Sequence, residues 1–292
     1  MKKKVFHSPC KEELTNKSSF FVYNKNGDDM KILITGATSG IGFDLAKNLA
    51  NKNHTVYITT HTEKQKETVK KKIKTEKLNI LVFKMDITSS EDRDLINKID
   101  IDCLVSHAGI GEGGSILDID IDILRKNYET NVFSNFALIQ EFYKKKIKEK
   151  KTAKIFVTSS LASVLPIPYL GCYTSSKAAI TMIAMTIKKE LKDKNMKNIT
   201  ISLIEPGAYN TGFNRVMIDN KEDNLKNTDL SSQEIYKINK KQRKLFNLIE
   251  KNSTESIVKK VSTEIEKKRP KFKIKAPLSQ ALFYKLYLLL FW

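Results

Sequence analysis

A tyrosine and a lysine four positions apart, Tyr173 and Lys177, have the residue types and the spacing for proton transfer. Side chains with this spacing share one face of a helix, so the two project into the same space. A free phenol has a pKa of about 10, which is too high for an efficient base at neutral pH. A nearby ammonium favours the phenolate and lowers that pKa. The pair therefore predicts a tyrosine that exchanges a proton with a carbonyl or alcohol oxygen, although alone it also fits an exposed helix face.

Ser160 stands thirteen residues before Tyr173, at the end of a predicted strand. Active sites of parallel sheets collect at the carboxyl ends of strands. The Ser160 hydroxyl can donate a hydrogen bond to the same substrate oxygen as negative charge develops on it. Ser159 and Ser163 offer the same chemistry, and the spacing to Tyr173 selects Ser160.

A glycine-rich turn at 35–42 lies between the first predicted strand and a predicted helix. Glycines allow a tight turn, a close approach of the backbone to a pyrophosphate, and close packing of helix on strand. The following helix offers free N–H groups and the positive end of its dipole to phosphates. The predicted phosphate-binding residues are Gly36, Thr38, Ser39, Gly40, Ile41 and Gly42.

These side chains need elements to position them, and the chain supplies a regular alternation. Short β-branched apolar runs indicate buried strands, and amphipathic stretches between them indicate helices. We expect strands at 31–35, 55–60, 80–84, 103–106, 154–158 and 200–204, with a last one at 271–275. We expect helices near 41–52, 62–75, 90–98, 119–149, 173–194 and 252–268. This alternation predicts right-handed βαβ units and a single α/β domain with a doubly wound parallel sheet of the Rossmann type.

Three segments fall outside the alternation. Residues 1–29 are polar and aperiodic, which predicts a mobile extension before a domain that spans 30–276. Within that domain, residues 210–250 are polar and helical in places, as expected of an insertion that covers a substrate. Residues 277–292 form an apolar tail.

The apolar tail is too short for a confident bilayer span, which needs about 20 apolar residues. It can cover the protein's own substrate pocket or a subunit contact. It can also lie in a membrane interface, helped by the basic residues at 267–275. We expect burial against protein and keep peripheral membrane contact as the alternative.

The spacing T-G-x-x-x-G-x-G, together with Y-x-x-x-K, resembles the short-chain dehydrogenase/reductase family from Met30 to about Thr211. Further motifs of that family follow in its order. Asp86 matches an adenine-contacting acid, 106–109 matches its N-N-A-G element, and 206–211 matches its P-G segment. Asn131 matches the asparagine that joins the proton relay, where it would hold a water linking Lys177 to solvent.

The resemblance implies residue roles that the single motifs do not. The implied catalytic set is Asn131, Ser160, Tyr173 and Lys177. The implied cofactor-binding residues beyond the glycine turn are His61, Asp86, Ala108, Gly109, Tyr173, Lys177, Pro206, Gly207 and Thr211. His107 departs from the family, which has asparagine there to tie neighbouring strands together. We expect the imidazole to take over that structural task with different geometry.

Cofactor preference is decided after the second predicted strand. An acid there accepts the ribose 2′-hydroxyl of NAD, whereas the 2′-phosphate of NADP needs a cation and repels an acid. Thr60 occupies the acid position, and His61 stands where NADP-preferring members tend to carry arginine. We therefore predict NADP, with Glu63 as the residue that argues against it.

Composition limits the partners. The net charge is +19, but only five of the 52 basic residues are arginine and the lysines are spread along the chain. Base readout and bidentate phosphate recognition favour arginine, so we expect no specific nucleic acid partner. The three cysteines have no metal-binding spacing, and we predict no metal and a cytoplasmic location, with or without membrane association.

These observations predict an NAD(P)(H)-dependent oxidoreductase that interconverts a carbonyl and an alcohol, with Tyr173 as acid and base. Apolar residues in the expected specificity segments favour NADPH-dependent reduction of a hydrophobic substrate. The alternative is a non-catalytic nicotinamide-binding sensor or scaffold on the same fold, since a fold does not determine a function. The family resemblance implies a homo-oligomer.

Overall fold

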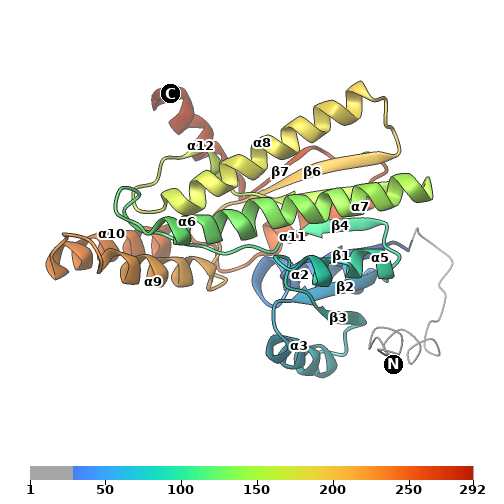
Figure 1. The fold of residues 1–292 in the computed structure, drawn as a ribbon, viewed down its shortest axis with the longest axis horizontal. Helices are drawn as coiled ribbons and strands as arrows, with labels where there is room; N and C mark the ends of the chain where they lie inside the picture. Colours follow the sequence, from blue (N-terminus) through green and yellow to red (C-terminus); the bar gives the residue numbers. More distant parts are fainter. Residues whose placement is uncertain (1–28, 292) are drawn as a thin grey trace, which may run out of the picture.

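A parallel seven-stranded sheet organises the computed structural model, which describes residues 29–291 and the side chains of 29–289 (Figure 1). The strand order is β3-β2-β1-β4-β5-β6-β7, and every neighbouring pair is parallel. The strands are β1 (Lys31–Ile34), β2 (Thr55–Thr60), β3 (Ile80–Lys84), β4 (Cys103–Ser106), β5 (Ala153–Thr158), β6 (Ile199–Pro206) and β7 (Lys273–Ala276). The order reverses direction between β1 and β4, which creates the crevice where doubly wound sheets bind ligands. The predicted fold class is confirmed.

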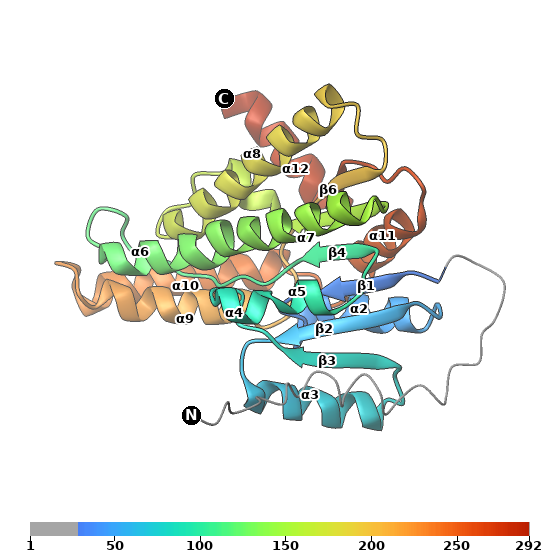
Figure 2. The same ribbon diagram turned by 45° about the vertical axis from the view of Figure 1, so that its right-hand side comes forward.

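Helices cover both faces of the sheet (Figures 1 and 2). One face packs against α2 (Gly40–Ala50), α3 (Glu63–Thr75) and α11 (Glu255–Glu266), and the other against α5 (Leu95–Lys98), α7 (Asn135–Glu149) and α8 (Gly171–Asp193). The remaining helices are α4 (Ser90–Arg93), α6 (Ile121–Tyr128), α9 (Phe213–Leu225), α10 (Ser232–Ile249) and α12 (Leu278–Phe291), with a short 3₁₀ turn at Leu161–Val164. Two hydrophobic clusters result, one on each face.

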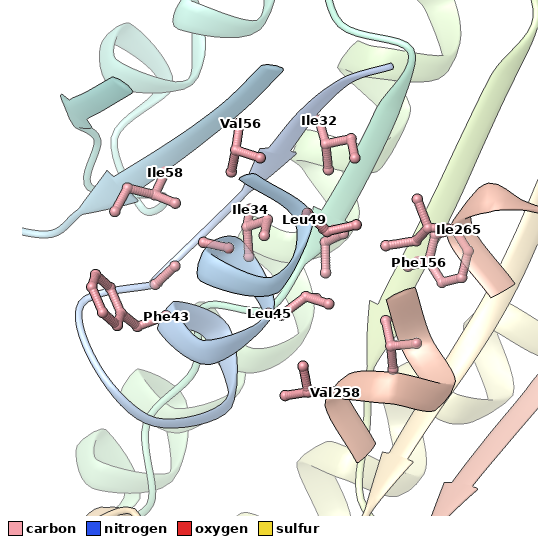
Figure 3. Packing of buried hydrophobic residues seen from close by; sticks show 14 of the residues in the cluster. Ile32, Ile34, Phe43, Leu45, Leu49, Val56, Ile58, Phe156, Val258 and Ile265 are labelled. Atoms are coloured by element: carbon pink, nitrogen blue, oxygen red, sulfur yellow. The ribbon is translucent and has the colours of Figure 1, made fainter. Parts of the chain in front are cut away.

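Close packing of α2 onto β1 places the glycine turn. Phe43, Leu45 and Leu49 of α2 belong to the same hydrophobic cluster as Ile32 and Ile34 of β1 (Figure 3). Each of these five side chains is buried, and burial of such residues supplies the main driving force for docking a helix on a sheet. The start of α2 is thereby held next to the end of β1.

The predicted long helix at 119–149 is not continuous. A π-helical turn at Glu129–Ser134 separates α6 from α7. The side-chain Nδ2 of Asn135 donates to the Thr130 carbonyl at 2.8 Å, which satisfies a backbone acceptor of the widened turn. Single π turns of this kind occur frequently at functional sites. The periodicity of the sequence showed the helical segment and missed this turn.

The segment at 210–250 forms α9 and α10, which lie side by side beyond the carboxyl edge of the sheet (Figure 2). Arg243 of α10 bonds Asp219 of α9 at 2.7 Å. Side-chain amides of α9 also reach the loop after β4: Asn220 donates to the Gly111 carbonyl at 3.1 Å and Asn224 to the Gly113 carbonyl at 2.7 Å. The two helices are therefore attached to the loop that precedes α6.

The two ends of the chain were expected to lie outside the alternating strands and helices. The predicted mobile extension lies outside the described residues, apart from Asp29. The apolar tail forms α12, which follows β7 and contacts the 3₁₀ turn after β5. No helix within residues 29–291 is long and apolar enough to cross a membrane.

Candidate active site

A cavity of about 1790 Å³ runs along the carboxyl edge of the sheet and contains most of the predicted site. The predicted residues that line it are Gly36, Thr38, Ser39, Gly40, Ile41, His61, Asp86, Ala108, Gly109, Ser160, Tyr173, Lys177, Pro206, Gly207 and Thr211. Gly42 and Asn131 do not line it. Gly42 lies beneath His107, and Asn131 lies behind the cavity wall.

The glycine turn has no room for side chains. Gly36 has a φ of +64°, and a Cβ there would lie 2.6 Å from the Cα of Ala108 in the loop after β4. The two loops at the strand-order reversal therefore touch backbone to backbone, as a narrow dinucleotide crevice requires. Ser39 precedes α2 without a side-chain cap, so the first N–H groups of that helix face the cavity end. These features fit a pyrophosphate.

His107 does tie the strands together. Its Nδ1 lies 3.1 Å from the Thr158 hydroxyl at the end of β5, and its amide donates to the Thr35 hydroxyl at 2.9 Å. A Cβ on Gly42 would lie 2.8 Å from the imidazole, so the glycine makes space for the larger ring. Burial lowers the pKa of His107 to about 4, and the Lys177 ammonium adds to that effect. The imidazole is therefore neutral at physiological pH and links the end of β4 to β5, while the His107 backbone amide links it to the end of β1.

Ser160, Tyr173 and Lys177 meet at the end of β5. Ser160 follows the strand and accepts a hydrogen bond from the Ala162 amide at 3.1 Å, while α8 carries the other two on one face. The Lys177 ammonium donates to the Thr158 carbonyl at 3.1 Å and lies 5.8 Å from the centre of the Tyr173 ring. The Tyr173 ring in turn packs on Phe213 of α9, with 5.6 Å between ring centres.

Burial dominates the electrostatics of this set. It raises the pKa of Tyr173 to about 12, although a hydrogen bond with Ser160 works in the opposite direction. It also lowers the pKa of Lys177 to about 8. We expected Lys177 to bring the phenol pKa down, and in the protein alone this effect is smaller than the cost of burying a phenolate. Tyr173 is therefore held in its protonated form, which is the form that donates a proton to a carbonyl.

Asn131 sits in the π turn with its amide on the backbone of the loop after β4. Its Oδ1 accepts from the Ile110 amide at 2.9 Å, and its Nδ2 donates to the Ile110 carbonyl at 2.9 Å. A Cβ on Gly109 would lie 3.0 Å from Asn131 Oδ1 and 3.5 Å from Lys177 Nζ. The asparagine thus lies directly behind Gly109, close to the ammonium.

The far end of the cavity contains His61 and Asp86, which lie 3.6 Å apart between Nδ1 and Oδ1. Burial acts to raise the pKa of Asp86, and hydrogen bonds from the Thr88 amide and hydroxyl outweigh it, so the pKa is lowered. Thr60 is buried, and its hydroxyl donates to the Thr62 carbonyl. Thr62 caps α3, so a helix amino terminus opens next to His61. The end of β2 therefore supplies a threonine and not an acid at this position, and the nearby acid is Asp86 after β3.

Sequence reasoning offered the substrate pocket as one place for the segment that forms α12, but it named none of the residues that enter the site. Gln280, Phe283 and Tyr284 line the cavity although they lie more than a hundred residues after Tyr173. Tyr284 is close enough that its charge would raise the Tyr173 pKa further. The apolar tail signalled burial or contact, but nothing in it indicated which residues would enter the site. Glu112, in the loop after β4, also lines the cavity, and burial raises its pKa.

Comparison with known proteins identifies the family. A profile described as short chain dehydrogenase matches residues 30–222, well over half of the chain. The chain therefore belongs to the short-chain dehydrogenase/reductase family, and it is an oxidoreductase that acts on CH–OH and C=O groups. Among the described residues, no group of three or more histidines, cysteines and acids is placed to hold a metal ion.

Similar proteins carry the names of different reductases and dehydrogenases. The chain is 26% identical over 197 residues to dehydrogenase/reductase SDR family member 4 of Bos taurus, covering 65% of this chain and 69% of that one. It is 28% identical over 263 residues to 3-ketodihydrosphingosine reductase of Bacteroides thetaiotaomicron, covering 87% and 90%. A short chain dehydrogenase/reductase of Burkholderia phymatum in complex with NAD shares the fold with a TM-score of 0.74 and 18% identity, covering 89% and 93%.

Proposed function

We propose that this chain reduces a hydrophobic ketone with NADPH. The observation that carries the proposal is the meeting of Ser160, Tyr173 and Lys177 in one cavity that continues from the glycine turn to an apolar mouth. A sensor or scaffold on the same fold would need the cofactor crevice alone. The full set of proton-transfer residues supports catalysis instead.

The proposed roles follow from the geometry. The nicotinamide cofactor, when bound, supplies the hydride to the carbonyl carbon. Tyr173 supplies the proton to the carbonyl oxygen, because burial keeps its phenol protonated. Ser160 donates a hydrogen bond to the same oxygen as negative charge develops there. Lys177 then returns a proton towards Tyr173. The ammonium regains its own proton from solvent through the polar groups around Asn131.

Two features support NADPH over NADH. The position where NAD-binding members place an acid is occupied by the buried Thr60, and the exposed His61 lies beside the amino terminus of α3. A helix amino terminus and an imidazole both favour a phosphate over a second hydroxyl. A structurally similar actinorhodin polyketide ketoreductase was solved with NADPH, at a TM-score of 0.67 and 19% identity.

The substrate class is proposed from the cavity walls. Beyond Tyr173 the lining is mainly apolar and includes Leu165, Ile167, Met217, Phe246 and Phe283. Apolar walls with a few polar groups around the reacting atoms fit an elongated ketone with an acyl or alkyl chain. The relative from Bacteroides thetaiotaomicron, which is named 3-ketodihydrosphingosine reductase, aligns over 87% of this chain.

The test begins with fluorescence titration of the full chain with NADPH and with NADH, which requires no substrate. We expect tighter binding of NADPH. A panel of ketones of increasing chain length, including 3-ketodihydrosphingosine, is then followed by loss of NADPH absorbance. Tyr173→Phe should lower turnover by about 10²–10⁴-fold, because it removes the proton donor, while cofactor binding stays nearly unchanged.

Each result has a clear meaning. Preference for NADH would overturn the cofactor proposal and leave the oxidoreductase. Binding of neither cofactor, or full activity in Tyr173→Phe, would contradict the proposed mechanism. Reduction of short polar ketones only would contradict the proposed substrate class.

We further propose a cytoplasmic homo-oligomer. The described cysteines Cys103 and Cys172 are both buried and unpaired, which is compatible with a reducing compartment. Exposed apolar side chains in the π turn before α7 and on α8, such as Phe133 and Met182, supply surface for a subunit contact. Light scattering on the purified chain measures the oligomeric state directly.

A further inference from the structure

Helix α12 has two faces with different environments. One face is held on the protein: Gln280 Oε1 accepts from the Ala208 amide at 2.7 Å, and Gln280 Nε2 donates to the Ile249 carbonyl at 2.7 Å. Tyr284, one turn later, lines the catalytic cavity. The inner face of α12 therefore forms part of the wall of the active site.

The outer face of α12 is an exposed leucine stripe, which consists of Leu278, Leu282, Leu286 and Leu289. These side chains are 70%, 59%, 50% and 71% exposed. Their spacings of four, four and three residues place them along one side of the helix. An apolar side of this length on an otherwise well-packed protein indicates a contact with something else.

The stripe adjoins the mouth of the cavity. Phe283 of α12 and Leu248 and Leu245 of α10 all line the cavity and are 63%, 82% and 50% exposed. In both views the end of α12 projects away from the sheet (Figures 1 and 2). The exposed apolar surface of α12 therefore lies next to the opening through which an apolar substrate would enter.

The surroundings of the stripe are cationic. From residue 267 to residue 292 the sequence contains seven lysines and arginines and no acid. Ile274 and Ala276 of β7 pack in the cluster on the α11 side, so Lys273 and Lys275 lie on the opposite face of the strand, where Lys275 is paired with Glu205 at 3.5 Å and Lys273 is exposed. Two exposed lysines, Lys241 and Lys251, line the mouth of the cavity itself.

The cations around the leucine stripe and the length of α12 together indicate what kind of partner the stripe contacts. A second copy of the chain would bring the same cations against one another, and this repulsion costs binding energy. A bilayer with anionic lipids offers apolar depth for the leucines and negative headgroups for the lysines at the same place. A helix of 14 residues is too short to span, since a span needs about 20, so α12 would lie in the interface.

We propose that the leucine stripe of α12 docks this protein on an anionic membrane surface, with the mouth of the active-site cavity next to the lipid. The substrate class then narrows to ketones that reside in the bilayer, an extension that rests on the proposed function. Docking itself needs neither cofactor nor turnover.

The test is co-sedimentation of the full chain with vesicles of phosphatidylcholine, with or without phosphatidylglycerol, at low and high salt. We expect binding to the anionic vesicles and weaker binding at high salt. The double variant Leu282→Ser/Leu289→Ser should bind at least about tenfold more weakly, because it removes apolar area from the interface. The control Leu117→Ser/Ile121→Ser removes side chains that are 92% and 53% exposed before and on α6 and should bind like the parent.

Several results would overturn the proposal. Absence of binding to anionic vesicles would do so, as would equal loss in both double variants. A dimer that dissociates in the α12 variant and shows no vesicle binding would assign the stripe to a second copy. Reduction of a soluble ketone is assayed separately: activity without vesicle binding contradicts docking alone, and vesicle binding without activity contradicts the proposed function alone.

Discussion

At the scale of single residues, burial determines the protonation of the active site. Tyr173 is expected to act as an acid at neutral pH because burial disfavours its phenolate. The same desolvation makes the Lys177 ammonium costly, since among the described residues it donates to the Thr158 carbonyl and no carboxylate raises its pKa. A buried cation without a counter-ion lowers stability, and active sites commonly carry such a cost.

This cost predicts a pH-dependent stability. The folded-state pKa of Lys177 is about 8, below its usual 10.5. Between these values the unfolded chain binds a proton that the folded chain lacks, so this residue makes stability rise with pH. We expect Lys177→Met to be more stable than the parent at pH 7, and the difference to shrink by about 1 kcal/mol by pH 9. Denaturant unfolding at both pH values measures it.

A constant difference between the two proteins across that range would show that the ammonium is not desolvated. Turnover is the second measurement on Lys177→Met, and we expect this variant to lose most of its activity. Gain of stability together with loss of activity would identify Lys177 as a residue retained for chemistry.

At the scale of elements, the π turn between α6 and α7 positions the loop after β4. The turn brings Asn131 into contact with the Ile110 backbone, and that loop contributes Gly109 to the cavity. A regular α-helix would rotate Asn131 away from this position, because each residue adds about 100° of rotation along a helix of 3.6 residues per turn. The position of the element, and not the residue type alone, gives the asparagine its role.

Asn131→Ala should therefore affect both structure and catalysis. Loss of two bonds to buried backbone groups is expected to cost about 1–3 kcal/mol of unfolding free energy. We expect turnover to fall by about tenfold or more, since Gly109 lies between Asn131 and the Lys177 ammonium. Arg125→Ala on α6, whose side chain is 70% exposed, is the matched control and should change neither quantity. An Asn131→Ala protein with parental turnover would remove Asn131 from the catalytic set.

At the scale of the whole molecule, the cofactor crevice joins segments from both halves of the sheet. The cavity runs from His61 after β2, past Gly36 after β1, to Thr211 after β6. A ligand that contacts all of these segments binds only the folded chain and stabilises it as a unit. The single sheet predicts that the described domain unfolds in one cooperative transition.

Saturating NADPH should therefore raise the melting temperature of this single transition. At a concentration about a hundred times the dissociation constant, the expected stabilisation is about 2.7 kcal/mol, or about 5 °C for a chain of this size. Tyr173→Phe should keep the shift. Gly36→Ala should abolish it, because a Cβ would lie 2.6 Å from the Ala108 backbone at a φ of +64°. A shift retained in Gly36→Ala would place the cofactor elsewhere.

The sequence by itself determined the alternation of strands and helices, the glycine turn and the spacing of Ser160, Tyr173 and Lys177. These features depend on short-range periodicity. Residues four positions apart on a helix share a face, and the carboxyl ends of parallel strands all lie at the same edge of the sheet. Each could be predicted because its geometry is set within about twenty residues of chain. The interpretation of His107 as a structural bridge came from the resemblance to the family, which has asparagine there.

Only the tertiary structure decided what distant segments contribute. Tyr284 and Gln280 reach the site because α12 folds back over the end of β6, and no local pattern encodes that contact. The π turn depends on the Asn135 side chain bonding Thr130, a competition that apolar periodicity does not report. The pKa values of Tyr173 and Lys177 are set by desolvation, which exists only once the surrounding elements have packed.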